Sequence, residues 1–324
     1  MRRTTAAAAL FLVPALLLTG CGSSTKSQAA STPTVGGSFG KSATLTLPAV
    51  AGASKQQVVT TVSQGSGAAV TSSDVVVAQL LVKDWTTGKT ISDTFSTKAA
   101  FVGATGSMLP ALKSAMVGHK VGSRVLVVAP PADAASQIAA EQAQAASQAA
   151  QEGQQAPTSL GVAATDTLAM VVDIQNAVSS QGQASGAAQS PVAGMPTVDA
   201  SAAKAATITI PKGAKAPTAL QTAVLVKGTG PKVTAGQTIV AQYTGVTWAT
   251  GKVFDSSWND SGAASFQIGV GAVVKGWDES LVGQTVGSRV EVVIPPALGY
   301  GATAQGSIPA NSTLVFVVDI LAAA

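Results

Sequence analysis

The 324-residue chain has one cysteine and one histidine, Cys21 and His119. A single cysteine excludes a disulfide within the chain. Nucleophilic catalysis by serine or cysteine needs an adjacent base, most often a histidine, and a zinc site needs several cysteine or histidine ligands. Because Cys21 is near the amino terminus and His119 stands alone, the sequence can assemble neither kind of site. We expect no metal and no cofactor.

Charged residues are also scarce, at 10% of the chain. Without Arg2 and Arg3, which lie in the leader described next, 17 basic residues face 15 acidic ones. The basic residues form no cluster, so the sequence lacks the positive patch of a nucleic-acid-binding protein. We expect no nucleic-acid partner.

The amino terminus has the pattern of an export signal. Arg2 and Arg3 precede the apolar stretch Ala6–Leu18, which is too short for a membrane-spanning helix. Leu18-Thr19-Gly20-Cys21 resembles the lipobox of bacterial lipoproteins, in which the cysteine becomes the first mature residue and carries diacylglycerol. The resemblance implies a lipid anchor at Cys21 and an extracytoplasmic location on the bacterial cell membrane. An ordinary signal peptide that ends near a cysteine is the alternative.

The clearest feature that is present is a duplication. Thr44–Pro48 (TLTLP) returns as Thr207–Pro211 (TITIP), and Val117–Pro131 (VGHKVGSRVLVVAPP) returns as Val282–Pro296 (VGQTVGSRVEVVIPP). Matching segments in a fixed order indicate two homologous domains rather than a short-period solenoid. Polar stretches rich in Ser, Gly and Gln precede and separate the copies, and they predict a flexible tether and a linker. The predicted divisions are a signal peptide (1–20), a tether (21–42), a first domain (43–178), a linker (179–204) and a second domain (205–324).

The second copy shows the periodicities of both strands and a helix. Gln237–Val246, Arg289–Ile294 and Thr313–Leu321 are rich in β-formers, with apolar residues on alternate positions. Between the first two, Val274, Trp277 and Leu281 have the i, i+3, i+7 spacing of a short amphipathic helix. Short strands around one short helix predict an α+β fold, an antiparallel sheet wrapped around a short α-helix in each domain.

Six short motifs occur in order on this scaffold. They are Tyr243-Thr244-Gly245, Phe254-Asp255-Ser256-Ser257, Val273-Val274-Lys275-Gly276-Trp277, Gly299-Tyr300-Gly301, Ile308-Pro309 and Leu314-Val315-Phe316. In this order and spacing they resemble the FKBP-type peptidyl-prolyl cis/trans isomerases, from Thr207 to about Leu321. The resemblance implies a half-open sheet wrapped across a helix, with an apolar pocket between them.

The resemblance also assigns the lining of that pocket. It places Trp277 at the floor. The expected aromatic walls are Tyr243, Phe254 and Phe316, and the expected residues at the helix start are Val273 and Val274.

Three polar groups complete the pocket that the resemblance implies. The Tyr300 hydroxyl and the Ile308 backbone N–H are expected to donate to a substrate carbonyl, and Asp255 to point its carboxylate into the cleft. The expected partners are proline-containing unfolded or exported polypeptides and, with weakened affinity, a macrolide ligand.

The chemistry of proline isomerisation suits this set of residues. Rotation about an X–Pro amide crosses a barrier of about 18–20 kcal/mol that comes from lost C–N resonance, and no bond is made or broken. A dry pocket that holds the proline ring and favours the twisted amide is sufficient, so aromatic walls and one or two donors can do the work. Each 1.36 kcal/mol of such preference gives about tenfold in rate.

Two of these residues also have ordinary structural explanations. Phe316 continues a strand face with Leu314 and Val318, so it can belong to the core as well as to the pocket. Asp255 can instead close a turn through its neighbouring serines.

The second copy departs from the family pattern at one rim of the pocket. Trp258-Asn259-Asp260 stands where a basic residue is common, and Ala263-Ala264 stands where Pro-Phe is common. We expect a shallower rim, and from it weaker macrolide binding and an altered substrate preference.

The first copy keeps the scaffold but not the pocket residues. Aligned on the repeat, aliphatic residues replace the aromatic ones and a serine replaces Asp255, so we expect this domain to lack isomerase activity. The replacements are Leu80 for Tyr243, Ile91 for Phe254, Ser92 for Asp255, Leu112 for Trp277 and Met170 for Phe316.

The first copy also carries the insertion Ala134–Glu152, rich in the helix formers Ala, Gln and Glu. It falls where the second copy has its Tyr300–Pro309 loop. A solvated spacer helix is the favoured interpretation, and a lid or partner-docking element is the alternative.

Together these features predict a peptidyl-prolyl isomerase that assists folding of exported proteins at the membrane surface. A non-catalytic chaperone or peptide-binding lipoprotein that uses the same pockets and apolar surfaces is the alternative. Eight of the 13 Phe, Trp and Tyr residues fall in the second copy, so we place the chemistry there.

Overall fold

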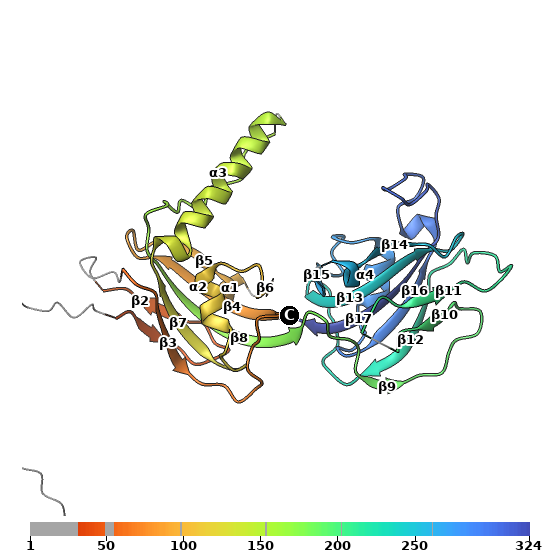
Figure 1. The fold of residues 1–324 in the computed structure, drawn as a ribbon, viewed down its shortest axis with the longest axis horizontal. Helices are drawn as coiled ribbons and strands as arrows, with labels where there is room; N and C mark the ends of the chain where they lie inside the picture. The colour runs from red at the N-terminus through yellow and green to blue at the C-terminus, as the bar shows by residue number, and fades with distance from the viewer. Residues whose placement is uncertain (1–31, 49–54, 98, 153, 202, 261) are drawn as a thin grey trace, which may run out of the picture.

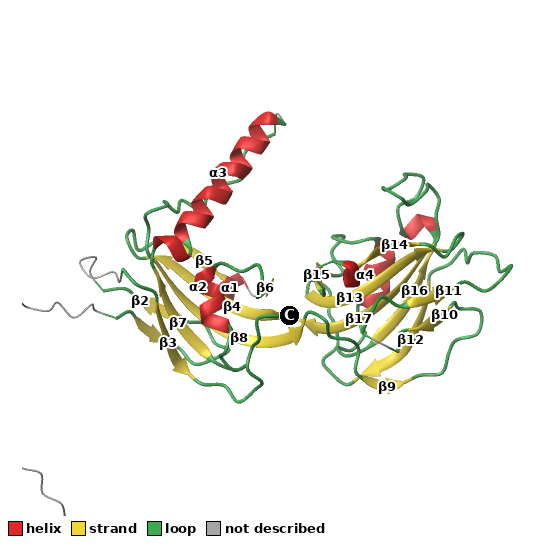
Figure 2. Cartoon of the chain, viewed as in Figure 1, coloured by secondary structure: helices red, strands yellow, loops and turns green. Residues whose placement is uncertain are grey.

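The computed structural model describes residues 32–48, 55–97, 99–152, 154–201, 203–260 and 262–324. The predicted signal peptide and Cys21 lie outside these ranges. The described chain forms two main antiparallel sheets, each with a short helix packed on it (Figures 1 and 2). This arrangement confirms the predicted α+β class. None of the helices within the described ranges is long and apolar enough to cross a membrane.

The first sheet has the strand order β3-β7-β8-β4-β5, with β6 paired to β4. Its strands are β3 (Val58–Ser63), β4 (Asp74–Asp84), β5 (Thr90–Asp93), β6 (Phe101–Ala104), β7 (Arg124–Ala129) and β8 (Leu168–Ser179). The helical segments are α1 (Thr94–Thr97), α2 (Pro110–Met116), the 3₁₀ turn η2 (Pro131–Asp133) and α3 (Ala135–Gln151). Pro110 occupies the first position of α2, where its missing N–H has no helical acceptor to lose.

The second sheet repeats this plan, with the order β14-β13-β17-β16-β12-β9 and β15 paired to β13. Its strands are β9 (Gly186–Ala188), β12 (Gln221–Gly228), β13 (Thr238–Thr247), β14 (Val253–Ser256), β15 (Ala264–Gln267), β16 (Arg289–Ile294) and β17 (Leu314–Ala323). The helical segments are η3 (Ser257–Asn259), α4 (Lys275–Leu281) and η4 (Pro296–Leu298). The three strands and the helix predicted for this copy are confirmed to within two residues at each end.

Each sheet is apolar on both faces, and the two faces belong to separate buried clusters. In β17, Leu314, Phe316 and Val318 point to the helix side and join the core around α4. Val315 and Val317 point to the other side, because side chains alternate along a strand, and they join a second buried cluster. The first sheet has the same two clusters. We call these faces the helix side and the arm side.

A short hairpin covers the arm side of each sheet. We call these hairpins the arms: β1 (Thr34–Gly36) pairs with β2 (Thr44–Thr46), and β10 (Thr197–Asp199) pairs with β11 (Thr207–Thr209). Leu45 of β2 and Ile208 of β11 are the arm residues that are buried in the arm-side clusters. Parts of the predicted tether and linker form strands, since β1 lies within 21–42, and β9 and β10 lie within 179–204.

The sequence did not reveal these short strands, and the reason is physical. Three-residue strands that bury one side chain each carry almost no periodicity, so their polar composition dominated the interpretation. The repeat itself contained the missed signal, because Pro33-Thr34-Val35 returns as Pro196-Thr197-Val198.

An arginine–aspartate pair fixes each arm to its sheet. Arg124 pairs with Asp173 at 2.6 Å, with both side chains fully buried, and it also donates to the arm carbonyls of Gly37 (2.6 Å) and Lys41 (2.8 Å). The second domain repeats this arrangement with Arg289 and Asp319 at 2.6 Å. These contacts use all the donor groups of a buried guanidinium, which is the condition for such a charge to be tolerated.

The two domains meet near the carboxyl terminus of the chain (Figure 1). Val75 and Val77 of β4 form one buried cluster with Val240 of β13 and Ala322 of β17. The Gln242 side-chain amide also donates to the Ser180 carbonyl at 2.6 Å. Helix α3 extends away from the first sheet (Figure 1), with only Ala135 and Ala149 buried among its residues.

Candidate functional site

Five aromatic rings meet between α4 and the helix side of the second sheet. They are Tyr243 of β13, Phe254 of β14, Phe266 of β15, Trp277 of α4 and Phe316 of β17. The structure thus brings together all four aromatic residues predicted for the pocket floor and walls. It adds Phe266, which pairs through its backbone with Ile239. The alternation of Phe266 with the buried Ile268 was the available signal for this residue.

Trp277 is at the centre of this aromatic cluster. Its ring lies 5.6 Å from that of Tyr243, 5.0 Å from Phe266 and 5.3 Å from Phe316, all edge to face. Such edge-to-face pairs contribute about 0.5–1.5 kcal/mol each beyond the area they bury. Trp277 is 4% exposed, and its indole N–H has no hydrogen-bond partner in the described chain. The cluster is therefore a rigid apolar floor with one unused donor.

Two glycines allow the rings and the helix to approach this closely. A Cβ at Gly245 would lie 2.6 Å from the Phe254 ring and 2.8 Å from the Phe316 ring. A Cβ at Gly276 would lie 2.6 Å from the Ile294 side chain, so Gly276 lets α4 rest directly on β16. In the first domain the contact between the helix and the strand is made by two alanines instead. Ala111 matches Gly276, and Ala129 matches Ile294.

Asp255 and Tyr243 form the polar edge of the cluster. The Tyr243 hydroxyl donates to Asp255 Oδ2 at 2.6 Å, and the Asp255 side chain is exposed. Burial, and next the hydrogen bond to Asp255, raise the pKa of the Tyr243 hydroxyl. Asp255 therefore faces the aromatic cluster from β14, and within the described ranges no backbone N–H donates to its carboxylate as a turn cap would require.

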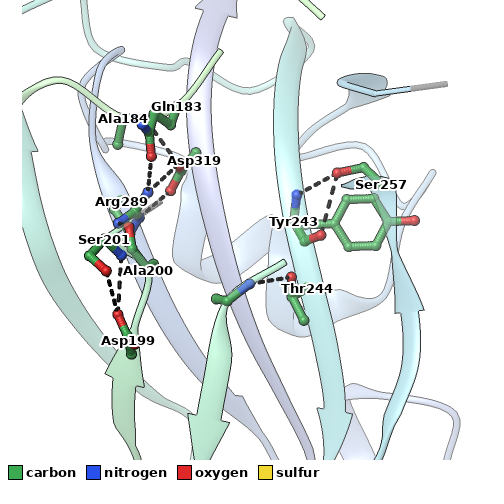
Figure 3. A network of polar contacts seen from close by, with 11 residues as sticks. Gln183, Ala184, Asp199, Ala200, Ser201, Tyr243, Thr244, Ser257, Arg289 and Asp319 are labelled. Atoms are coloured by element: carbon green, nitrogen blue, oxygen red, sulfur yellow. Dashed lines mark hydrogen bonds and ion pairs between the residues drawn. The ribbon is translucent and has the colours of Figure 1, made fainter. Parts of the chain in front are cut away.

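Side-chain hydrogen bonds hold the backbone of β13 at Tyr243, and we call this set of bonds the polar lock. The Tyr243 N–H donates to the Ser257 hydroxyl at 2.9 Å (Figure 3). That hydroxyl in turn donates to the Gln242 side chain. The first domain has the same lock, in which the Leu80 N–H donates to Thr94 at 2.7 Å and Thr94 to Gln79. The lock belongs to the scaffold, because it persists where the aromatic residues are absent.

The predicted role of the Ile308 N–H is not available in this structure. That N–H donates to the Gln305 carbonyl at 2.8 Å, closing the tight turn of the loop that follows η4. The Ile308 side chain is 6% exposed and packs into the core around Trp277. Ile308 thus contributes an apolar wall rather than a donor.

The remaining predicted residues border the cluster. Val273 and Val274 are half-buried and pack against the same core, immediately before α4. Tyr300 is 38% exposed, and it is close enough to Tyr243 to contribute to the raised pKa of that hydroxyl. Its own hydroxyl has no hydrogen-bond partner in the described chain, so it remains available to a ligand.

Comparisons with known proteins agree with this geometry. The family model described as FKBP-type peptidyl-prolyl cis-trans isomerase matches residues 230–321. An FK506-binding protein of Streptomyces anulatus is 44% identical over 98 residues, which cover 30% of this chain and 79% of that protein. This chain belongs to the FKBP-type peptidyl-prolyl cis-trans isomerase family.

Two further FKBP-family proteins match over a smaller part of their own length. FK506-binding protein 2 of Gibberella zeae is 41% identical over 90 residues, 28% of this chain and 46% of that protein. The crystal structure of FkpA from Escherichia coli is 38% identical, covers 35% of this chain and 52% of that chain, and superposes with a TM-score of 0.31. Residues 183–324, which carry the match and its arm, are called the FKBP domain below.

The first domain has the same strand order as the FKBP domain but fills the place of the aromatic cluster. Leu80, Leu112 and Met170 are all buried in its helix-side core, and Ile91 packs against them. Aliphatic side chains there offer neither flat walls nor an indole or phenol donor. Among the described residues, no group of three or more metal-ligating side chains is present in either domain.

Proposed function

We propose that the FKBP domain isomerises X–Pro bonds in exported polypeptides, with the cluster of Tyr243, Phe254, Phe266, Trp277 and Phe316 as the proline-binding floor and walls. The observation that carries this proposal is the unpartnered, buried indole N–H of Trp277 within that cluster. A buried donor costs free energy unless something accepts from it. A substrate carbonyl is an acceptor of the right kind.

The mechanism needs no reactive group. The rings exclude water from the amide, and a twisted amide with its weaker dipole loses less by leaving water than a planar one. Tyr300 supplies a second donor at the mouth of the proline-binding site. The hydrogen bond from Tyr243 to Asp255 holds the Tyr243 ring in place as one wall of that site. Catalysis then consists of holding the proline ring while the preceding carbonyl rotates.

A refolding assay limited by proline isomerisation tests the proposal. The full mature chain should accelerate the slow phase in proportion to its concentration. Binding of the unfolded substrate without any acceleration would identify the non-catalytic chaperone instead. The variant that makes this assay decisive is described in the Discussion.

We also propose that the chain is anchored by a lipid at Cys21 on the outer side of a bacterial cell membrane. The lipobox-like sequence Leu18-Thr19-Gly20-Cys21 supports this location. An anchored isomerase would meet polypeptides as they leave the export machinery.

Replacing Cys21 with serine is expected to release the protein from membranes, because serine offers no thiol for the thioether. Fractionation of cells that express each form measures this, with Ser24→Ala as the matched control that retains Cys21. Serine-variant protein that stays in the membrane fraction would contradict the anchor.

For macrolides we propose binding that is weaker than is ordinary for the family. Phe266 provides one wall, but the small side chains of Ala263 and Ala264 make the rim beside it shallow. Asp260 adds a negative charge where a basic residue is common in the family. A fluorescence titration of Trp277 with a macrolide should therefore give reduced affinity. Replacing Asp260 with lysine should raise it, and ordinary family-level affinity in the unmodified protein would contradict the proposal.

A further inference from the structure

The FKBP domain has a cavity on the arm side of its sheet, which is the face opposite the aromatic cluster. Its volume is about 370 Å³. Apolar residues from the segment before the arm, from β10 and from β12 form most of its wall, namely Pro191, Val192, Pro196, Val198, Leu225 and Val226. This volume is within the range of pockets that hold small ligands.

Glu291 of β16 lies at the bottom of this cavity. Its side chain is 1% exposed, and neither carboxyl oxygen has a hydrogen-bond partner in the described chain. Burial raises the pKa of Glu291 to about 7. A buried carboxyl group without a partner is unfavourable for folding, so its presence calls for an explanation beyond the fold.

The first domain shows that the fold does not need an acid at this position. Leu126 is the residue that matches Glu291, and it is 3% exposed in an apolar cluster with Leu45 and Trp85. The arm, the arginine and the aspartate are the same in both domains. The carboxyl group is therefore an addition specific to the FKBP domain.

The neighbouring charges leave Glu291 without a counter-ion. Arg289 also lines the cavity, but it donates to both oxygens of Asp319 and, at 2.7 Å, to the Ala200 carbonyl (Figure 3). From the arm, Asp199 lines the cavity, with Lys204 near it, and β12 contributes only apolar residues. Because Arg289 and Asp319 neutralise each other and Lys204 is near Asp199, the charge that has no counter-ion in the cavity is that of ionised Glu291.

We propose that this cavity binds a primary ammonium group carried on a short apolar chain, with the Glu291 carboxylate as its counter-ion. The apolar wall accepts the methylene chain, and the acid at the bottom accepts the ammonium hydrogens. The ammonium can come from a free amine or from a lysine side chain of a polypeptide. This site is separate from the isomerase site, because Glu291 points to the opposite face of β16 from Val290 and Val292.

Calorimetric titration of the full mature chain with n-hexylammonium tests the site. At about pH 8 we expect binding that is at least about tenfold tighter than that of hexan-1-ol, which has the same chain without the charge. A parallel titration with Nα-acetyl-lysine amide distinguishes the sources. Tighter binding of the lysine derivative assigns the site to a polypeptide, and tighter binding of n-hexylammonium assigns it to a free amine.

The pH dependence identifies Glu291 as the counter-ion. Ammonium binding needs the ionised carboxyl group, so the affinity should rise by up to about tenfold from about pH 6 to about pH 8, with release of a proton. Alkylammonium groups stay charged throughout that range. In Glu291→Gln the affinity should fall at least about tenfold and lose this pH dependence.

Two further variants serve as controls. Glu291→Leu copies the first domain, and it should abolish ammonium binding and raise the unfolding temperature at about pH 8. Asp199→Asn, at the rim, should change the affinity by less than about threefold. All three variants should keep the unmodified isomerase rate, so a failed isomerase assay and a failed binding assay remain distinguishable. Equal binding of hexan-1-ol, unchanged binding by Glu291→Gln, or no binding of either ammonium compound in the millimolar range would overturn the proposal.

Discussion

Replacing Trp277 with leucine is expected to lower kcat/KM for proline isomerisation by at least about tenfold while the FKBP domain stays folded. The indole makes edge-to-face contacts with three rings at 5.0–5.6 Å and carries the unused buried donor. Leucine removes the donor and the flat surface. Loss of a single transition-state interaction of about 1.4 kcal/mol gives a tenfold change.

The first domain provides the reason to choose leucine. Leu112 occupies the matching position in α2 and is buried in a complete apolar core. The substitution therefore reproduces a packing arrangement that this fold already accepts, and a loss of rate does not require unfolding.

The rate should be measured in the refolding assay alongside the thermal unfolding of each variant. Trp248→Phe is the matched control, because Trp248 is 7% exposed and belongs to the arm-side cluster on the other face of the sheet. It should leave the rate per folded molecule unchanged. A folded Trp277→Leu variant with full kcat/KM would exclude the aromatic cluster as the isomerase site.

Replacing Arg124 with alanine should destabilise the first domain by about 3–5 kcal/mol. The guanidinium is fully buried against Asp173, and its removal leaves an uncompensated buried carboxylate together with the arm carbonyls of Gly37 and Lys41. Denaturant unfolding followed by the fluorescence of Trp85, which lies in the adjacent cluster, measures the loss.

Two comparisons make the Arg124 experiment specific. Lys275→Ala removes an exposed ion pair with Glu279 at 3.6 Å and should cost less than about 1 kcal/mol. The double variant Arg124→Met with Asp173→Leu removes both charges and should recover only part of the loss, because the arm carbonyls remain without donors. A cost below about 1 kcal/mol for Arg124→Ala would show that the arm is not held by this arginine.

The sequence predicted the helix side of the second sheet well. The strands β13, β16 and β17, and the helix α4, lie where their periodicities placed them, because a strand or helix that buries one face must repeat its apolar residues at the period of that element. The aromatic residues followed, since Tyr243, Trp277 and Phe316 all lie on predicted buried faces. Local patterning was sufficient for the strands and the helix, while the resemblance to the FKBP family singled out the aromatic residues on them.

The sequence was a poor guide to backbone hydrogen bonds and short strands. The Ile308 N–H was expected to face a substrate, yet it closes a turn onto Gln305, a choice that depends on loop conformation rather than residue type. The segments that form β1 and β10 were expected to be flexible, because an arm strand of three residues has too few positions to show a period.

The duplication by itself determined that this protein has one scaffold in two versions, and that only the second carries an aromatic cluster. Composition, with one cysteine and one histidine, gave the expectation of neither a Ser/Cys–His catalytic set nor a zinc site. The tertiary structure alone decided that the arms cover the outer faces of the sheets and that Glu291 is buried beneath one of them without a partner. Burial of that kind depends on which distant segment lies over a strand, and alternation along the strand cannot reveal what covers either face.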